Sequence, residues 1–167
     1  PNNETIMDRL LNAIIPHVSE NNICVVVGYK KNLIIEKYPS LNYVVNNQYE
    51  FTNTSKSLLL ALNDMKGDKD IIWINGDLII DKIVFTHIHS YEGSCMAVSN
   101  KSSLDDEEIK YTINANGNIL NVSKIIENGL GEAFGLNKIS KENINLLKRS
   151  LKECKNTDYF EKGIEIA

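Results

Sequence analysis

The chain has 167 residues, of which 43% are hydrophobic and 24% are charged. This length and balance predict a single globular domain, residues 1–167, with a sizeable hydrophobic core. The formal net charge of -4 argues against a general nucleic-acid-binding surface. No apolar run approaches the roughly 20 residues that span a bilayer. We therefore expect neither a nucleic-acid partner nor a membrane partner.

The three cysteines, Cys24, Cys95 and Cys154, are odd in number and widely separated. They form no CxxC motif of the kind that binds a metal or carries out redox exchange. This pattern favours buried thiols in a reducing compartment, and hence a cytoplasmic protein.

The first half of the sequence alternates helical and strand patterns. Thr5 can cap the first helix, with Asp8 three positions later, as in a variant of the capping box. The predicted elements are a helix at 6–18, a strand at 23–27, a helix at 31–38, a strand at 43–45, a helix at 55–65 and a strand at 71–74. This alternation implies right-handed crossovers and a mainly parallel sheet.

The second half of the sequence changes pattern after Asp81. The dipeptide Asn116-Gly117 between two strand-like runs is a strong β-hairpin signal. The predicted elements are a helix at 82–91, strands at 95–98, 110–114, 118–123 and 133–139, and a final helix that Ser140 can cap. We therefore predict an α/β protein whose mixed sheet is parallel at first and gains antiparallel strands later.

The strand at 71–74 ends in Asn75-Gly76-Asp77. Its continuous apolar run suits a strand that is buried on both faces of a sheet. Open α/β sheets bind ligands just outside the carboxyl ends of their strands. Asp77 is therefore placed where a carboxylate could hold a divalent cation against a phosphate. The alternative is that these residues form only a turn.

Two further polar groups have both a structural and a functional interpretation. Asn53, Thr54 and Ser57 precede or begin a helix, where they either cap it or help its free N–H groups bind a ligand. Glu132 lies between glycines at the entrance of a strand. Those glycines either permit close approach of a ligand or mark a β-bulge.

Other conspicuous residues favour structural roles. His87 and His89 point about 200° apart if they lie in a helix, as we expect, and cannot then share a metal ion. The acidic run at 105–108 is typical of a solvated loop. Tyr159 and Phe160 are predicted core residues. The sequence contains neither a GxGxxG motif nor a Walker-type loop.

Several short motifs occur in an order and at a spacing that are more specific than any one of them. They are VGYK at 27–30, NNQY at 46–49, TNT at 52–54, SL at 57–58, NGD at 75–77, NG at 116–117, VSK at 122–124, GE at 131–132 with Gly135, and YFE at 159–161. In this order the chain resembles the nucleotidyltransferases that make sugar nucleotides and related CDP compounds. The branch it resembles most is the cytidylyltransferases of phosphocholine and aminoethylphosphonate type.

This resemblance implies a Rossmann-like three-layer α/β/α sandwich with a mixed, mainly parallel sheet. It implies attack by an acceptor phosphate or phosphonate on the α-phosphorus of a nucleoside triphosphate, with Mg²⁺ neutralising the developing charge. The implied site residues are Asp77 as catalytic residue and metal ligand, Glu161 as a further metal ligand, Asn53, Thr54, Ser57 and Gly76 beside the nucleotide and substrate, and Glu132 facing the substrate.

The chain departs from the family's pattern at its start. The family opens with a strand and a glycine-rich loop that carries an Arg, followed by a Lys-Pro segment, and these hold the triphosphate. This sequence begins at Pro1 and runs almost directly into its first helix. We therefore expect a nucleotidyltransferase-like domain that lacks this N-terminal strand and loop. Lys162 also stands where the family often has an Asp.

We therefore expect a cytoplasmic, Mg²⁺-dependent cytidylyltransferase-like enzyme. Its substrates would be CTP and a small phosphorylated acceptor, activated for capsule or other surface-polymer synthesis. One alternative is a sugar-1-phosphate nucleotidyltransferase. Another is a non-catalytic nucleotide-binding or regulatory domain. The low aromatic content of 7% gives no clear cage for a choline group, and the sequence indicates no particular oligomeric state.

Overall fold

The structure, a computed structural model, describes residues 4–65, 69–100 and 103–167. Its α-helices are α1 (Ile6–Ile14), α2 (Lys31–Lys37), α3 (Thr54–Asp64), α4 (Lys82–Ser90), α5 (Ile144–Glu153) and α6 (Phe160–Ile166). Its strands are β1 (Cys24–Val27), β2 (Asn42–Val45), β3 (Ile71–Ile74), β4 (Cys95–Ser99), β5 (Lys110–Ile113), β6 (Ile119–Ser123) and β7 (Glu132–Ile139). None of the described helices is long and apolar enough to cross a membrane.

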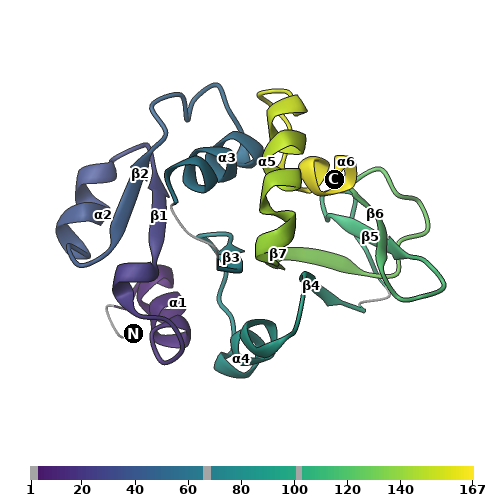
Figure 1. Cartoon of the computed structure of the whole chain (residues 1–167), viewed down its shortest axis with the longest axis horizontal. Helices are drawn as coiled ribbons and strands as arrows, with labels where there is room; N and C mark the ends of the chain where they lie inside the picture. The colour runs from purple at the N-terminus through teal and green to yellow at the C-terminus, as the bar shows by residue number, and fades with distance from the viewer. Residues whose placement is uncertain (1–3, 66–68, 101–102) are drawn as a thin grey trace.

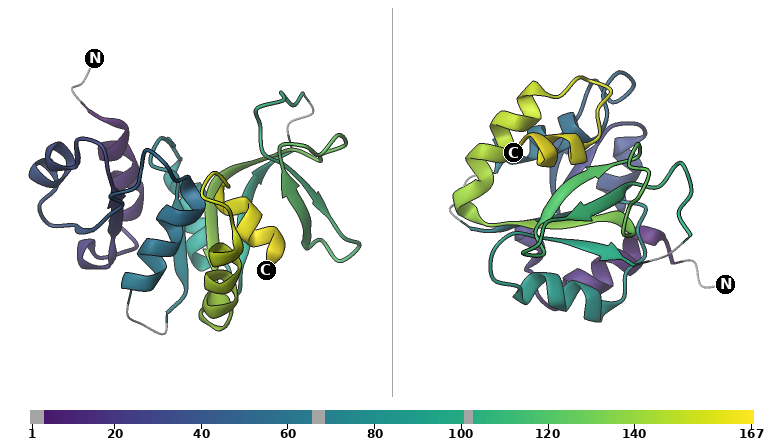
Figure 2. Two further views of the ribbon diagram at one scale, coloured as in Figure 1. Left: turned by 90° about the horizontal axis from the view of Figure 1, so that it is seen from above. Right: turned by 90° about the vertical axis from the view of Figure 1, so that its right-hand side faces the viewer.

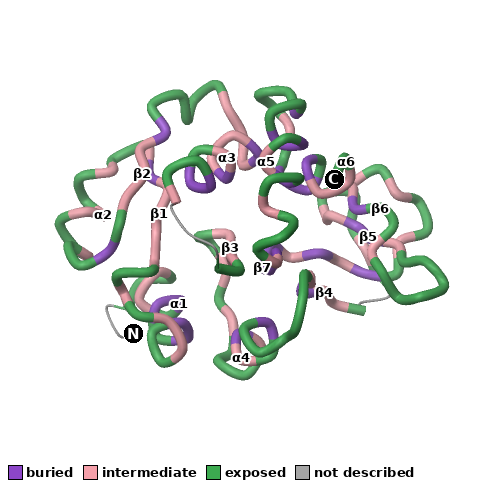
Figure 3. The backbone as a smooth tube through the Cα atoms, in the orientation of Figure 1, coloured by how far each residue is buried: buried purple, intermediate pink, exposed green. Residues whose placement is uncertain are grey.

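The helices and strands form three layers (Figure 1). The helices α1 and α4 lie on one side of the strands, where Leu10, Ile14 and Phe85 form a buried cluster that also contacts β3. The helices α3, α5 and α6 lie on the other side, where their apolar residues pack against Trp73 of β3. The buried residues accordingly follow the boundaries between the layers (Figure 3). This is the α/β/α arrangement that the sequence predicted.

Each predicted strand and helix is present, with ends that differ by a few residues. The helix α1 ends at Ile14 rather than Val18, because Pro16 has no N–H and restricts the residue before it. The short helix α6 was not predicted. Phe160 is buried as expected, but the prediction for Tyr159 was wrong, because its side chain is 44% exposed.

The strands form two separate hydrogen-bonded sheets. The strands β1 and β2 pair in parallel over their full length, from Cys24 opposite Asn42 to Val27 opposite Val45. The other sheet has the order β3-β7-β5-β6, with β4 also paired to β7, and all of these pairings are antiparallel. The α/β class is confirmed, but among the described strands parallel pairing is confined to β1 and β2.

The long strand β7 explains this difference from the expected sheet. It pairs with β4 on one side and with β3 and β5, one after the other, on the other side, so it lies at the centre of its sheet. The hairpin predicted at Asn116-Gly117 joins β5 to β6 and extends from the end of the molecule opposite to α2 (Figure 2). Gly117 has a φ of 80°, which explains the glycine in this turn.

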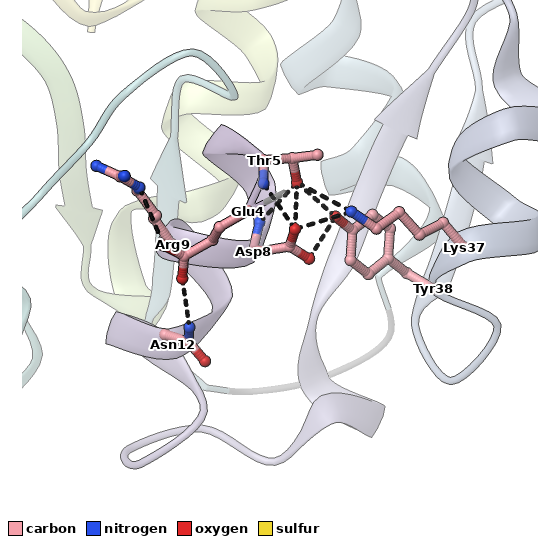
Figure 4. Close-up of polar contacts among 7 residues, drawn as sticks. All are labelled: Glu4, Thr5, Asp8, Arg9, Asn12, Lys37 and Tyr38. Carbon is pink, nitrogen blue, oxygen red and sulfur yellow. Dashed lines mark hydrogen bonds and ion pairs between the residues drawn. The ribbon is translucent and has the colours of Figure 1, made fainter. Parts of the chain in front are cut away.

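Asp8 links α1 to the end of α2 (Figure 4). It forms the predicted capping box, in which Thr5 Oγ1 accepts from Asp8 N at 3.1 Å and Asp8 Oδ2 accepts from Thr5 N at 2.7 Å. The same carboxylate accepts hydrogen bonds from Lys37 Nζ and Tyr38 Oη, each at 2.8 Å. These donors, led by Lys37, hold the pKa of Asp8 well below its ordinary value.

We expect Asp8→Asn to lower the denaturation midpoint at neutral pH, because the amide loses the charge that Lys37 neutralises. A depressed carboxyl pKa stabilises the folded state above the ordinary value of about 4, and this stabilisation is lost as the pH falls below it. The difference between wild type and variant should therefore shrink toward pH ~3. Glu36→Gln, an exposed change on α2, is the control. A difference that is the same at both pH values would contradict this account.

Candidate active site

The carboxyl ends of β1 and β2 lie at one edge, because the two strands are parallel. The backbone N–H of Asn46, directly after β2, donates to the carbonyl of Val27 at the end of β1, at 2.8 Å. Gly28 and Asn46 are therefore neighbours at this edge. In an open α/β sheet this is the edge where ligands bind.

Asn46 fastens the loop that follows β2 to α3. Its side chain is only 4% exposed. Its Nδ2 donates to Thr52 Oγ1 at 2.9 Å and to Ser57 Oγ at 3.2 Å, and its Oδ1 accepts from Gln48 N at 2.9 Å. The loop 46–53 is thus fixed from inside, and Ser57 is brought to the strand edge.

Asn53 caps α3 and also contacts the C-terminal part of the chain. Its Oδ1 accepts from Thr54 N at 2.8 Å, which is the capping role. Its backbone N–H donates to the carbonyl of Asn156 at 2.7 Å, and its Nδ2 donates to the carbonyl of Thr157 at 3.2 Å. The capping interpretation of Asn53 is confirmed, while a role beside a nucleotide stays a prediction.

The segment before α6 covers the N-terminus of α3. Ser55 N donates to the carbonyl of Asp158 at 3.4 Å, so this helix N–H already has an acceptor within the protein. In return, Phe160 N donates to Thr54 Oγ1 at 3.0 Å. Lys56 extends the same contact, because its ammonium donates to carbonyls at the end of α5, including that of Leu151 at 3.1 Å. The starts of α3 and α6 therefore form one unit.

The carboxyl end of β3 lies on the same side of the molecule. The Trp73 ring meets the Phe160 ring edge-on, with 5.8 Å between centroids and an interplanar angle of 88°. Because Phe160 is hydrogen bonded to Thr54, Trp73 lies close to the start of α3. The residues that follow Ile74 form a turn, in which Leu78 N donates to the carbonyl of Asn75 at 3.2 Å, so the turn interpretation of Asn75-Gly76-Asp77 is confirmed and a role in ligand binding stays a prediction.

Asn75 and Gly135 lock the end of β3 to β7. Asn75 N donates to the carbonyl of Gly135 at 2.9 Å. Gly135 has a φ of 82°, and a Cβ there would lie 2.3 Å from Asn75 Nδ2, so only glycine suits this position. The next two residues, Gly76 and Asp77, are exposed. A Cβ added to Gly76 would meet no atom within 4 Å. Asp77 thus has access to a ligand from solvent.

Glu132 lies farther along β7. It is half-buried at the start of the strand, opposite Ser99 of β4 and Lys110 of β5. It lies three positions before Gly135, which corresponds to about 10 Å of strand. The preceding Gly131 lies so close to the Ser99 carbonyl that any Cβ there would clash. The glycine here serves strand packing, and the predicted contact of Glu132 with a substrate stays a prediction.

Glu161 is the carboxylate in the described part of the chain whose pKa is raised well above its ordinary value. Its side chain is 5% exposed, and its Oε2 has no hydrogen-bond partner within the protein. Burial raises its pKa to about 7, against smaller opposite effects from a backbone hydrogen bond and from Lys124. A buried acid with a raised pKa is a functional-site candidate on physical grounds.

Other buried polar atoms without a protein partner belong to the elements that meet around Phe160. They are Ser55 Oγ on α3, Trp73 Nε1 on β3 and both amide atoms of Asn137 on β7. Asn137 is the direct partner of Trp73 across the β3–β7 pair. Buried polar groups normally have hydrogen-bond partners, so this group indicates room for water or a polar ligand. No sequence signal singled out Ser55 or Asn137, because neither belongs to a recognisable motif, and Asn46 stood out only as the first residue of the NNQY motif at 46–49.

Known structures with a similar arrangement are nucleotide-transferring enzymes. The inositol-1-phosphate CTP transferase from T. maritima aligns with a TM-score of 0.67 and 14% identity, over 96% of this chain and 82% of that one. The CTP:phosphocholine cytidylyltransferase from Streptococcus pneumoniae aligns with a TM-score of 0.66 and 14% identity, over 99% of this chain and 72% of that one. The nucleoside-diphosphate-sugar pyrophosphorylase from Vibrio cholerae RC9 aligns with a TM-score of 0.67 and 10% identity, over 99% of this chain and 75% of that one. The chain has the nucleotidyltransferase fold.

No protein-family model matches the sequence, and no curated protein matches it. At identities of 10–14% the structural likeness establishes the nucleotidyltransferase fold alone. Among the described residues, no group of three or more His, Cys, Asp or Glu side chains is placed to share a metal ion. His87 and His89 lie in α4, the helix in which the sequence placed them.

We expect Glu161→Gln to remove a pH dependence of stability. Because the folded-state pKa is raised, the wild type loses stability as the pH rises from about 4 through 7, where the carboxyl must ionise while buried. In urea titrations, the free energy of unfolding of the variant minus that of wild type should increase by on the order of 2 kcal/mol from pH ~5 to pH ~8. The control is Glu153→Gln on the exposed face of α5. A parallel pH profile for wild type and E161Q would contradict a buried, neutral Glu161.

Proposed function

We propose that this domain is a nucleotidyltransferase that transfers CMP from CTP to a small phosphorylated metabolite. A phosphate oxygen of the acceptor attacks the α-phosphorus of CTP. The bond from that phosphorus to the β-phosphate oxygen breaks, and pyrophosphate leaves. We further propose that the product is an activated precursor for capsule or other surface-polymer synthesis.

The observation that carries this proposal is the convergence of polar groups at one strand edge. Hydrogen bonds join the loop after β2 to the start of α3 and join α3 to the start of α6, Trp73 of β3 packs against Phe160, and Asn75-Gly76-Asp77 follows directly after β3. These segments include an exposed carboxylate, Asp77, and a buried one, Glu161. An edge of this kind suits a charged substrate. Nucleotidyl and phosphoryl transfer are catalysed mainly by positioning the reacting groups and by electrostatic stabilisation of the transition state.

The choice of CTP rests on two of the similar structures, which are CTP transferases by their own description. The pyrophosphorylase from Vibrio cholerae favours a sugar-nucleotide product instead. A sugar 1-phosphate is therefore the second candidate acceptor. Both candidates use the same bond changes at phosphorus, so one assay with several acceptors distinguishes them.

Asp77 and Glu161 are the residues that we propose to hold Mg²⁺. Carboxylate oxygens are suitable donors for this hard cation, and the partnerless Oε2 of Glu161 fits a role as ligand. Mg²⁺ typically takes one or two protein carboxylates together with substrate phosphates and water. A cluster of three protein ligands is therefore not required. The ion would neutralise charge on the phosphates when bound.

We expect pyrophosphate release from the gene product, with its upstream residues included, when Mg²⁺, CTP and the correct acceptor are present. The panel comprises the four nucleoside triphosphates against phosphocholine, aminoethylphosphonate, phosphorylated amino acids and sugar 1-phosphates. Asp77→Ala should reduce turnover by about 100-fold or more, because metal-supplied charge stabilisation is worth several kcal/mol. Asp106→Ala, an exposed acidic residue elsewhere, should leave turnover unchanged.

Nucleotide binding without turnover across this panel would favour a regulatory domain. Turnover that is unchanged in Asp77→Ala would remove Asp77 from the metal site. Neither result depends on knowing the acceptor in advance, because pyrophosphate is the common product.

We also propose that residues upstream of Pro1 supply a strand between β1 and β3, followed by the triphosphate-binding loop. Within the described residues, β1 pairs only with β2, and β3 pairs only with β7, so each has one unpaired edge. Their residues are largely half-buried although nearly all are apolar. The strand edges lie between the α1/α4 and α3 layers (Figure 1). Unpaired edges of this kind are templates for a further strand.

We expect the backbone amides of β1 and β3 to exchange more slowly in the protein with its upstream residues than in this 167-residue chain. The exchange rates should fall by about 100-fold or more, because a strand that is hydrogen bonded to the edges of both β1 and β3 shields their amides from water. The amides at the outer edge of β6 are the internal control. Equal exchange at β1 and β3 in the two proteins would rule out the added strand.

A further inference from the structure

Exposed aromatic side chains gather beyond the carboxyl ends of β1 and β2. Tyr29 is 68% exposed, and Tyr49 is 39% exposed. Their rings lie 6.2 Å apart between centroids, at an interplanar angle of 51°. The ammonium of Lys30 lies 5.1 Å from the centre of the Tyr29 ring. Aromatic rings left in water at a ligand-binding edge require an explanation.

The backbone holds these rings in place. Gly28 lies so close to Tyr49 that a Cβ on it would come within 2.7 Å of the Tyr49 Cβ and Cγ atoms. The glycine therefore lets the Tyr49 side chain lie directly against the end of β1. Tyr49 is carried by the loop 46–53, which Asn46 fastens from inside by its side-chain hydrogen bonds. The position of Tyr49 is thus fixed from both strands.

An open cavity of 470 Å³ adjoins the rings. It is lined by Gly28, Lys30, Lys31, Asn32 and Leu33. The two lysines give this cavity a positive charge, although the chain as a whole carries a net charge of -4. A ligand that contacts both the rings and the cavity would combine a flat apolar part with a negative charge.

We propose that Tyr29, Lys30, Lys31 and Tyr49, which we call the aromatic-basic surface, bind the base and a phosphate of the nucleotide substrate. This inference rests on the proposed function and assigns the base-binding part of that site. Stacking on aromatic rings suits any nucleobase, and lysine ammonium groups suit phosphate. A quaternary ammonium acceptor is disfavoured there, because Lys30 already places a cation against the Tyr29 ring.

The test compares ligand binding by ring variants and by lysine variants of the gene product with its upstream residues. Tyr29→Leu and Tyr49→Leu keep apolar bulk but remove the aromatic face. Each should weaken binding of CMP and of cytidine about tenfold in calorimetry, the loss expected for a stacked base. Lys30→Gln should weaken the binding of CMP but not the binding of cytidine, because cytidine has no phosphate. Tyr91→Leu, an exposed tyrosine after α4, is the matched control.

Three results would contradict the proposal in whole or in part, and they are distinguishable. If wild type binds CMP and releases pyrophosphate while both ring variants bind cytidine normally, the base lies elsewhere and the proposed function stands. If wild type binds neither CMP nor CTP and shows no turnover, both proposals fail together. A uniform loss of CMP and cytidine binding in Lys30→Gln would also contradict the separate phosphate role of that lysine.

Discussion

The structure depends on the docking of the segment before α6 onto the start of α3. Hydrogen bonds from Asn53 to Asn156 and from Phe160 to Thr54 join parts of the chain more than 100 residues apart. They satisfy helix groups that would otherwise need water or a ligand. They also place Phe160 against Trp73, so the end of β3 is held beside the start of α3. This contact therefore brings the starts of α3 and α6 together with β3 at the candidate active site.

The same contact explains the buried acid at the site. Glu161 is buried because α6 packs against α3 and β6. Burial disfavours the charged carboxylate and so raises its pKa. A carboxylate used only for folding would be expected to have partners for both oxygens. The partnerless oxygen of Glu161, like those of Asn137 and Ser55, is available to water or to a ligand, as the proposed metal-binding role of Glu161 requires.

Local sequence signals predicted the elements well but not how the strands pair. Thr5 with Asp8 gave the start of α1, and Asn116-Gly117 gave the β5–β6 hairpin, because caps and turns depend on neighbouring residues. The pairing of β3 with β7 joins distant residues, so no local pattern contains it. Helix α6 has only seven residues, too few for a clear periodic signal, and Tyr159 was wrongly placed in the core.

The candidate site was predictable where a residue follows a strand or caps a helix. Asn53 and Asp77 could be singled out in this way, since the ends of strands and helices are visible in the sequence. The aromatic-basic surface could not, because it depends on the close approach of Gly28 and Tyr49 from two different strands. The low aromatic content suggested no cage, yet two tyrosines placed side by side are enough to form a stacking surface.

The central claim is that the edge formed by β1, β2 and β3 binds a nucleoside triphosphate. The most direct measurement is a titration of the isotope-labelled protein, upstream residues included, with CTP and Mg²⁺, followed through backbone amide resonances. The account predicts shifts concentrated at residues 28–31, 46–57 and 75–77 and at Glu161. Shifts confined to the outer faces of α4 and α5, or no shifts at saturating CTP, would contradict it.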